Sequence, residues 1–241
     1  MNSEEYEKIK SEISDRLEEV NRQISDVLSG CGRSRESLTL IGVSKFFPPE
    51  YARAAYELGL HDLGENRVQE LLSKKELLSS EGIHPNWHLI GTLQTNKVKN
   101  VVGNTELIHS VSSFELIEEV QKRSMTKNLT TKILLQINTA REESKHGFFK
   151  EEIGRAVELA SSCPNLMLCG LMTMAPVQNA EHEALRVFTE TREIFDRLKN
   201  EAGEPEIWNV LSMGMSQDYI DAIQCGSTHI RIGTSIFGKR S

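Results

Sequence analysis

The chain has 241 residues and a formal net charge of −7, and 38% of its residues are hydrophobic and 26% charged. This composition is typical of a globular protein, and the length suits one large domain or two small ones. General nucleic-acid-binding proteins need a basic face to displace the counterions of phosphates, so an acidic chain predicts no nucleic-acid partner.

The sequence also lacks the features of membrane and exported proteins. No apolar run approaches the length that spans a bilayer, and the N-terminal segment MNSEEYEKIK is highly charged. We therefore expect a cytoplasmic protein with no membrane partner. The cysteines are Cys31, Cys163, Cys169 and Cys225. Because they are scattered and form no C-x-x-C pair, they predict free thiols, neither disulfides nor a metal site.

Residues 1–32 are predicted to form a leading helix. Apolar residues recur three or four positions apart, which is the spacing of one helical face. They are Ile9, Ile13, Leu17, Val20, Ile24, Val27 and Leu28. Gly30 and Gly32 follow this stripe and can end the helix.

After the leading helix, short apolar runs alternate with amphipathic segments. The predicted strands are 38–43, one near 61–63, 87–91, 106–111, 132–138, 166–174, 207–213 and 229–233. The predicted helices lie near 49–58, 66–79, 94–102, 113–125, 150–162, 180–201 and 216–224, with none after the last strand.

Regular alternation of strands and helices indicates a parallel sheet. Eight such strands predict an α/β fold of the (β/α)8 TIM-barrel class, a single domain over 1–241 with the barrel at 37–239. The leading helix then covers one end of the barrel or completes its outer ring. An open doubly wound sheet is the alternative.

The first predicted strand ends on a lysine, in the stretch LTLIGVSKFFPPE. Lysine strongly resists burial, so Lys45 either reaches solvent at the end of the strand or stands at the mouth of a pocket. Active sites of (β/α)8 barrels lie at the C-terminal ends of the strands, which is where Lys45 is expected.

The loops after the last two predicted strands read LSMGMSQD and RIGTSIFG. The corresponding loops of (β/α)8 barrels often bind phosphate, and both offer glycine and hydroxyl groups. The hydroxyl donors are Ser212, Ser216, Thr234 and Ser235. Ordinary turn and N-cap chemistry is the alternative for either loop alone. Their joint position favours a phosphate cradle.

Arg231 stands between two isoleucines on a strand that is expected to be central. A buried guanidinium needs a partner, which is either an acidic residue in a structural ion pair or an acceptor on a ligand. Together with Lys45 and a phosphate cradle, it suggests a phosphorylated aldehyde or ketone held as a Schiff base. A sugar phosphate and pyridoxal phosphate both fit, and the lysine pKa must fall from about 10.4 for the attack.

The sequence resembles a known family at several motifs. GVSKFFP, LGENRVQE, WHLIGTLQTNK, QINTAREESKHGF, GLMTM, LSMGMSQDY and GSTHIRIGTSIFG are similar, in this order, to the motifs of the pyridoxal phosphate homeostasis proteins. That family resembles the N-terminal barrel of alanine racemase. The resemblance covers roughly residues 35–239. It implies a barrel in which Lys45 holds pyridoxal 5'-phosphate (PLP) as a Schiff base.

The motif match also implies roles for further residues. Ser212, Gly233 and Thr234 fall on phosphate-binding positions. Arg231 falls on the position that faces the pyridine nitrogen, and Asn66 on a position near the cofactor. Other matches have no assigned role: His88, Gln94, Asn96, Lys97 and Lys145. The FFPP stretch after the lysine is bulkier than the usual family sequence.

The resemblance implies a PLP-binding protein of intracellular PLP homeostasis, with little or no catalysis. An arginine at the ring nitrogen keeps that nitrogen unprotonated, which weakens the ring as an electron sink. A racemase also needs an acid/base group on each face of its substrate. In alanine racemase the second group comes from a second domain, and the sequence ends soon after Arg231, so we expect none.

Two other functions remain open at this point. A PLP-dependent amino-acid racemase is the first alternative, and a Schiff-base aldolase acting on a sugar phosphate is the second. The expected partners are the cofactor itself and PLP-dependent apoenzymes, and the expected oligomeric state is a monomer.

Overall fold

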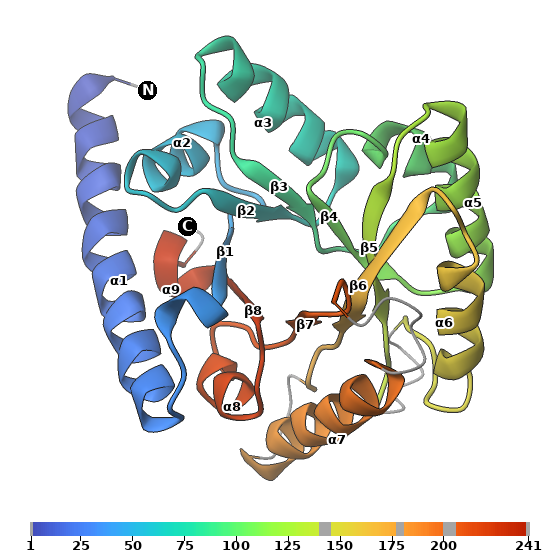
Figure 1. The fold of residues 1–241 in the computed structure, drawn as a ribbon. Helices are drawn as coiled ribbons and strands as arrows, with labels where there is room; N and C mark the ends of the chain where they lie inside the picture. The colour runs from blue at the N-terminus through green and yellow to red at the C-terminus, as the bar shows by residue number, and fades with distance from the viewer. Residues whose placement is uncertain (1, 140–145, 177–180, 200–205, 240–241) are drawn as a thin grey trace.

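A computed structural model describes residues 2–139, 146–176, 181–199 and 206–239 (Figure 1). Eight parallel strands pair in chain order, and β8 returns to pair with β1, so the sheet closes into a barrel. The strands are β1 (Thr39–Val43), β2 (Asp62–Glu65), β3 (Asn86–Leu89), β4 (Leu107–Val111), β5 (Thr131–Gln136), β6 (Leu166–Met172), β7 (Val210–Ser212) and β8 (His229–Ile232). The predicted (β/α)8 barrel is confirmed.

Helices surround this barrel in an outer ring (Figure 1). They are α1 (Ser3–Gly30), α2 (Pro49–Glu57), α3 (Val68–Ser80), α4 (Val98–Val101), α5 (Phe114–Thr126), α6 (Ile153–Ser161), α7 (Glu181–Lys199), α8 (Tyr219–Gln224) and α9 (Thr234–Phe237). Short 3₁₀ turns precede β1 and α4, at Arg35–Ser37 and Thr95–Lys97. The expectation of no helix after the last strand is wrong, because the four-residue α9 follows β8.

The leading helix α1 belongs to the outer ring. It packs against α2, α8 and α9, beside the strands β1 and β8 (Figure 1). Its buried face is made of Ile13, Leu17, Val20, Ile24 and Leu28. The side chain of Asn2 caps the helix by accepting the N–H of Glu5 at 2.8 Å. Because α9 is so short, α1 supplies the long helix on this side of the barrel.

The interior of the barrel is half apolar and half polar. Residues paired in parallel strands share a face, and alternate residues of each strand return to it. One side of the interior holds a small apolar cluster of Leu107, Leu134, Cys169, Met172 and Val210. The other side carries buried polar side chains, namely His88, His109, Ser212 and Arg231. Buried polar side chains cost stability, so a barrel that served stability alone would not need them. The polar half of the interior therefore indicates where a functional site lies.

One predicted strand starts later than expected. Residues 207–213 read as apolar, but β7 begins at Val210. The indole of Trp208 turns outward to α7, where its N–H donates to the carbonyl of Phe195 at 3.0 Å and its ring stacks on the Phe195 ring. Among the described helices, none combines the length and the apolar character needed to cross a membrane.

Candidate functional site

Lys45 lies just beyond the end of β1, at the C-terminal end of the barrel. The pairing of β1 with β8 places Ile41 beside Arg231. Side chains alternate between the faces of a strand, so Ile41 and Val43 share the inner face with Arg231. Lys45 follows two residues after Val43, beyond the strand, and is half-buried. The barrel therefore brings the lysine and the arginine to neighbouring strands.

A buried ion cluster holds the backbone before Lys45. Lys74 on α3 donates to the carbonyl of Ser44 at 2.8 Å. The same ammonium contacts Glu65 at 2.7 Å and Glu70 at 2.9 Å. The hydroxyl of Ser44 donates to Glu65 at 2.6 Å. Burial raises the pKa of Glu65, although the charge of Lys74 opposes this shift.

The residue after Lys45 is held by the same cluster. The N–H of Phe46 donates to Glu70 at 2.5 Å. Phe46 has a φ of 67°, in the left-handed region that residues with a side chain rarely adopt. Such a conformation costs about 1–3 kcal/mol and persists only where surrounding contacts fix it. Contacts on both sides therefore fix the direction in which Lys45 leaves the strand.

Asn66 lies at the same end of the barrel, one residue beyond β2, and is half-buried. The loop after β3 passes very close to its backbone. A Cβ atom on Gly91 would lie 2.4 Å from the carbonyl oxygen of Asn66, so only glycine allows this approach. The loop after β3 therefore packs against the backbone of Asn66 and holds it in place.

The loops after β7 and β8 lie against each other. The N–H of Gly233 donates to the hydroxyl of Ser216 at 3.2 Å, and the N–H of Arg231 donates to the carbonyl of Gly214 at 3.0 Å. Thr234 is exposed and opens α9, whose N-cap Gly233 offers no capping side chain. The first N–H groups of a helix have no acceptor within the helix. This end of the barrel therefore offers amide donors and hydroxyls suited to an anion.

Arg231 is 4% exposed and lies inside the barrel. It donates to the hydroxyl of Ser212 at 2.5 Å and to the carbonyl of Thr173 at 2.9 Å. Among the described residues no carboxylate is within ion-pair distance of it, although the charge of Asp218 acts on it and opposes the lowering of its pKa. Burial lowers the pKa of Arg231 to about 10, so it stays charged at neutral pH. Its guanidinium has more N–H donors than these two contacts use, which fits an acceptor on a ligand.

Ser212 occupies a different environment from the exposed end of the loops. It is fully buried, and its hydroxyl lies 2.9 Å from Nδ1 of His109 besides accepting from Arg231. Its role on phosphate stays a prediction. The hydroxyl that contacts Gly233 belongs to Ser216. Ser216 lies four residues after Ser212 in the same loop, and this position in the sequence already marked it as a candidate hydroxyl of the site.

The other motif residues are spread over the structure. Gln94 and Asn96 are exposed and Lys97 is half-buried in the segment between β3 and α4, at the same end as Lys45. His88 is buried inside the barrel. Lys145 lies outside the described residues.

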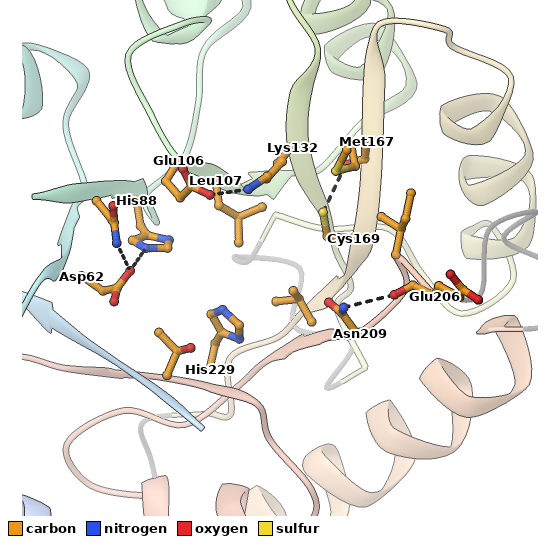
Figure 2. Close-up of a pocket in the computed structure, with 14 residues that line it drawn as sticks. Asp62, His88, Glu106, Leu107, Lys132, Met167, Cys169, Glu206, Asn209 and His229 are labelled. Atoms are coloured by element: carbon orange, nitrogen blue, oxygen red, sulfur yellow. Dashed lines mark hydrogen bonds and ion pairs between the residues drawn. The ribbon is translucent and has the colours of Figure 1, made fainter. Parts of the chain in front are cut away.

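A pocket of about 390 Å³ lies at the opposite, N-terminal end of the barrel (Figure 2). Its lining includes Asp62 and His229, which begin β2 and β8, together with His88, Lys132 and Cys169 from within β3, β5 and β6. Burial lowers the pKa of His229 to about 4 and raises the pKa of Cys169 to about 11, so both are uncharged at neutral pH. The four cysteines are free thiols, as predicted.

Comparison with known proteins places this arrangement in a family. The sequence profile described as alanine racemase, N-terminal domain, matches residues 48–241. A pyridoxal phosphate homeostasis protein of Aquifex aeolicus is 40% identical over 230 residues, covering 94% of this chain and 97% of that protein.

Solved structures agree with this result. PipY of Synechococcus elongatus, solved with PLP bound, has a TM-score of 0.80 and 31% identity, covering 94% of this chain and 100% of that one. An alanine racemase of Clostridium difficile has a TM-score of 0.70 at 16% identity, covering 91% of this chain and 59% of that one, and shares the fold. The chain belongs to the pyridoxal phosphate homeostasis protein family, with a barrel of the alanine racemase N-terminal type.

Proposed function

We propose that this protein binds PLP at the C-terminal end of its barrel and acts in intracellular PLP homeostasis. The observation that carries the proposal is the pairing of β1 with β8, which puts Arg231 beside Ile41 on the strand that leads to Lys45. A buried arginine with unused donors and no carboxylate at ion-pair distance among the described residues suits a ligand acceptor such as the pyridine nitrogen. The PLP-bound relative PipY supports this choice of ligand.

Each residue of the site has a proposed task. Lys45 supplies the amine for a Schiff base, and PLP supplies the aldehyde, with loss of one water. The amide and hydroxyl of Thr234 hold the phosphate, the Ser216 hydroxyl joins them, and Gly233, whose N–H donates to Ser216, lets the backbone come close to the phosphate. Asn66 packs beside the cofactor from the β2 side. Ser212 contacts the phosphate or acts through Arg231. Its hydrogen bonds to His109 and Arg231 favour the second role.

The charge on Arg231 favours a carrier over a catalyst. A guanidinium donates to the ring nitrogen and cannot protonate it, so the ring stays a weak electron sink. Storage of PLP and its delivery to apoenzymes need only reversible binding. Racemisation on the cofactor requires a stabilised carbanion, which an unprotonated ring nitrogen disfavours.

The proposal is tested by titrating the protein with PLP and with pyridoxal while recording the absorbance spectrum. We expect PLP to give a saturable change in absorbance that borohydride fixes irreversibly. Pyridoxal lacks the phosphate and should bind far more weakly. Equal affinity for the two compounds would contradict the proposed phosphate site. A protein that takes up no PLP would contradict the proposed function.

Thr234→Ala is expected to weaken PLP binding by about 1.5–3 kcal/mol, because one hydrogen bond to a charged phosphate is lost. Titration by absorbance measures the change. Thr126→Ala, at the end of α5, is the matched control because its hydroxyl bonds the carbonyl of Lys122 away from the barrel end. Unchanged affinity in Thr234→Ala would show that its side chain does not touch the phosphate.

Exchange of the α-proton of alanine separates a carrier from an enzyme. With PLP bound, we expect the rate to stay within about tenfold of free PLP, since one well-placed acid/base group typically adds 10²–10⁴-fold. Deuterium incorporation in heavy water measures this rate and also detects half-reactions. Exchange about a thousandfold above free PLP would favour the racemase.

A further inference from the structure

A continuous chain of hydrogen bonds crosses the barrel interior from Arg231 to Asp62. Arg231 contacts the hydroxyl of Ser212 at 2.5 Å, and that hydroxyl lies 2.9 Å from Nδ1 of His109. Nε2 of His109 lies 3.0 Å from Nδ1 of His88. Nε2 of His88 lies 3.0 Å from a carboxylate oxygen of Asp62. The chain links residues of β8, β7, β4, β3 and β2.

The two ends of the chain fix the direction of every bond in it. A guanidinium can only donate, so the Ser212 oxygen accepts from Arg231, and its O–H is free to donate to Nδ1 of His109 when that nitrogen carries no proton. His109 then carries its proton on Nε2 and donates to His88. At the other end an ionised carboxylate can only accept, so His88 donates from Nε2 to Asp62. In this arrangement both imidazoles carry their proton on Nε2, and every link has one donor and one acceptor.

The charge states agree with this direction. His109 is fully buried, and burial, together with the nearby charge of Arg231, lowers its pKa well below its ordinary value. Burial alone would raise the pKa of Asp62, but hydrogen bonds from His88 and Asn86 oppose this, and the net shift is downward. Asp62 is thus the carboxylate that terminates the chain at neutral pH.

We propose that His109 and His88, ending on Asp62, are positioning residues that hold Arg231 toward the cofactor. Their fixed donor direction keeps the Ser212 oxygen turned to the guanidinium, so Arg231 is anchored on its inner side by two acceptors, Ser212 and Thr173. This role rests on the proposed PLP site. Asp62 and His88 also line the N-terminal pocket, so the hydrogen-bond chain runs from this pocket toward the cofactor end (Figure 2).

The tautomers are tested first in the protein without PLP. Histidine labelled with ¹⁵N shows in NMR spectra which ring nitrogen carries the proton. We expect the Nε2–H form for His88 and His109 at neutral pH. A proton on Nδ1 of His109, or a charged His109 ring, would overturn the proposal. This readout does not depend on PLP binding, so it separates failure of the chain from failure of the proposed function.

The effect on Arg231 is tested with variants of His109. His109→Leu should weaken PLP binding at least about tenfold, as expected when a hydrogen bond to a charged group loses its support. It should also shift the absorbance maximum of bound PLP and the Nε–H resonance of Arg231. His109→Gln retains an acceptor and a donor, and should recover most of the affinity and both spectral positions.

His229→Leu is the matched control. His229 lies beside His109, with ring centroids 6.4 Å apart, but bonds the hydroxyl of Thr228 and is not in the chain. Equal effects of His109→Leu and His229→Leu on affinity and spectra would overturn the proposal. If His109→Leu does not fold, Asp62→Ala replaces it, because Asp62 lies at the accessible end of the hydrogen-bond chain. It should shift the Arg231 resonance in the same direction, and an unmoved resonance would also overturn the proposal.

Discussion

Lys45→Ala is expected to abolish the covalent, borohydride-stable uptake of PLP while leaving the fold intact. The lysine is half-buried at a strand end and adds little to the hydrophobic core, so its loss should cost little stability. Its amine is the proposed partner of the PLP aldehyde, and alanine offers no nucleophile. Non-covalent binding through the phosphate contacts should remain, with lower affinity.

The measurement is absorbance before and after borohydride, with circular dichroism as the check on folding. Lys99→Ala is the control, because Lys99 is an exposed lysine on α4 and has no proposed role. The control should behave as the unaltered protein. A Lys45→Ala protein that still retains PLP after borohydride would assign the link to another lysine.

Lys74→Met is expected to lower the free energy of unfolding by about 3–5 kcal/mol, because it leaves the buried carboxylate of Glu65 without its cation. Glu65 is fully buried and Lys74 is 3% exposed, so water cannot take over this role. The backbone of Ser44 also loses its contact, so PLP affinity should fall as well.

Urea unfolding measures the effect of Lys74→Met. Lys75→Met is the control, since Lys75 is next in sequence and bonds only Asn104 at the surface of the α3 side. Adding Glu65→Leu to Lys74→Met should restore much of the stability, because the isolated charge is then gone. A loss below about 1 kcal/mol in Lys74→Met would mean that the pair is not buried as described.

The stability of Lys74→Met should also depend on pH. Burial raises the folded-state pKa of Glu65 above its unfolded value, and removing Lys74 removes an opposing influence. The folded state then binds a proton more tightly than the unfolded state, so the variant is most stable below the unfolded pKa of Glu65. Its stability falls as pH rises through the raised folded pKa.

Much of the fold follows from periodicity in the sequence. The stripe that contains Ile13 and Ile24 predicts α1, and the apolar run that ends at Val43 predicts β1, because local spacing decides which face is buried. The count of eight predicted strands, which indicates a barrel, also predicts that Lys45 and Arg231 lie at one end of the structure. The division into a leading helix at 1–32 and a barrel at 37–239 stays a prediction.

The polar networks could not be predicted in this way. His109 and Ser212 are 103 residues apart, and Ser44 and Glu65 are 21 apart, and only closure of the barrel brings each pair together. A single sequence does not show which polar residues meet inside a closed sheet. The short β7 was mispredicted for a related reason, since Trp208 reads as part of a strand until α7 offers it a partner.

The most direct test of the PLP site is to identify the lysine that carries the cofactor. The protein is loaded with PLP, reduced with borohydride, digested and analysed by mass spectrometry. The account predicts one phosphopyridoxyl group, on Lys45, in the peptide that contains GVSKFF. A group found on another lysine, or no modified peptide from a loaded protein, would contradict it.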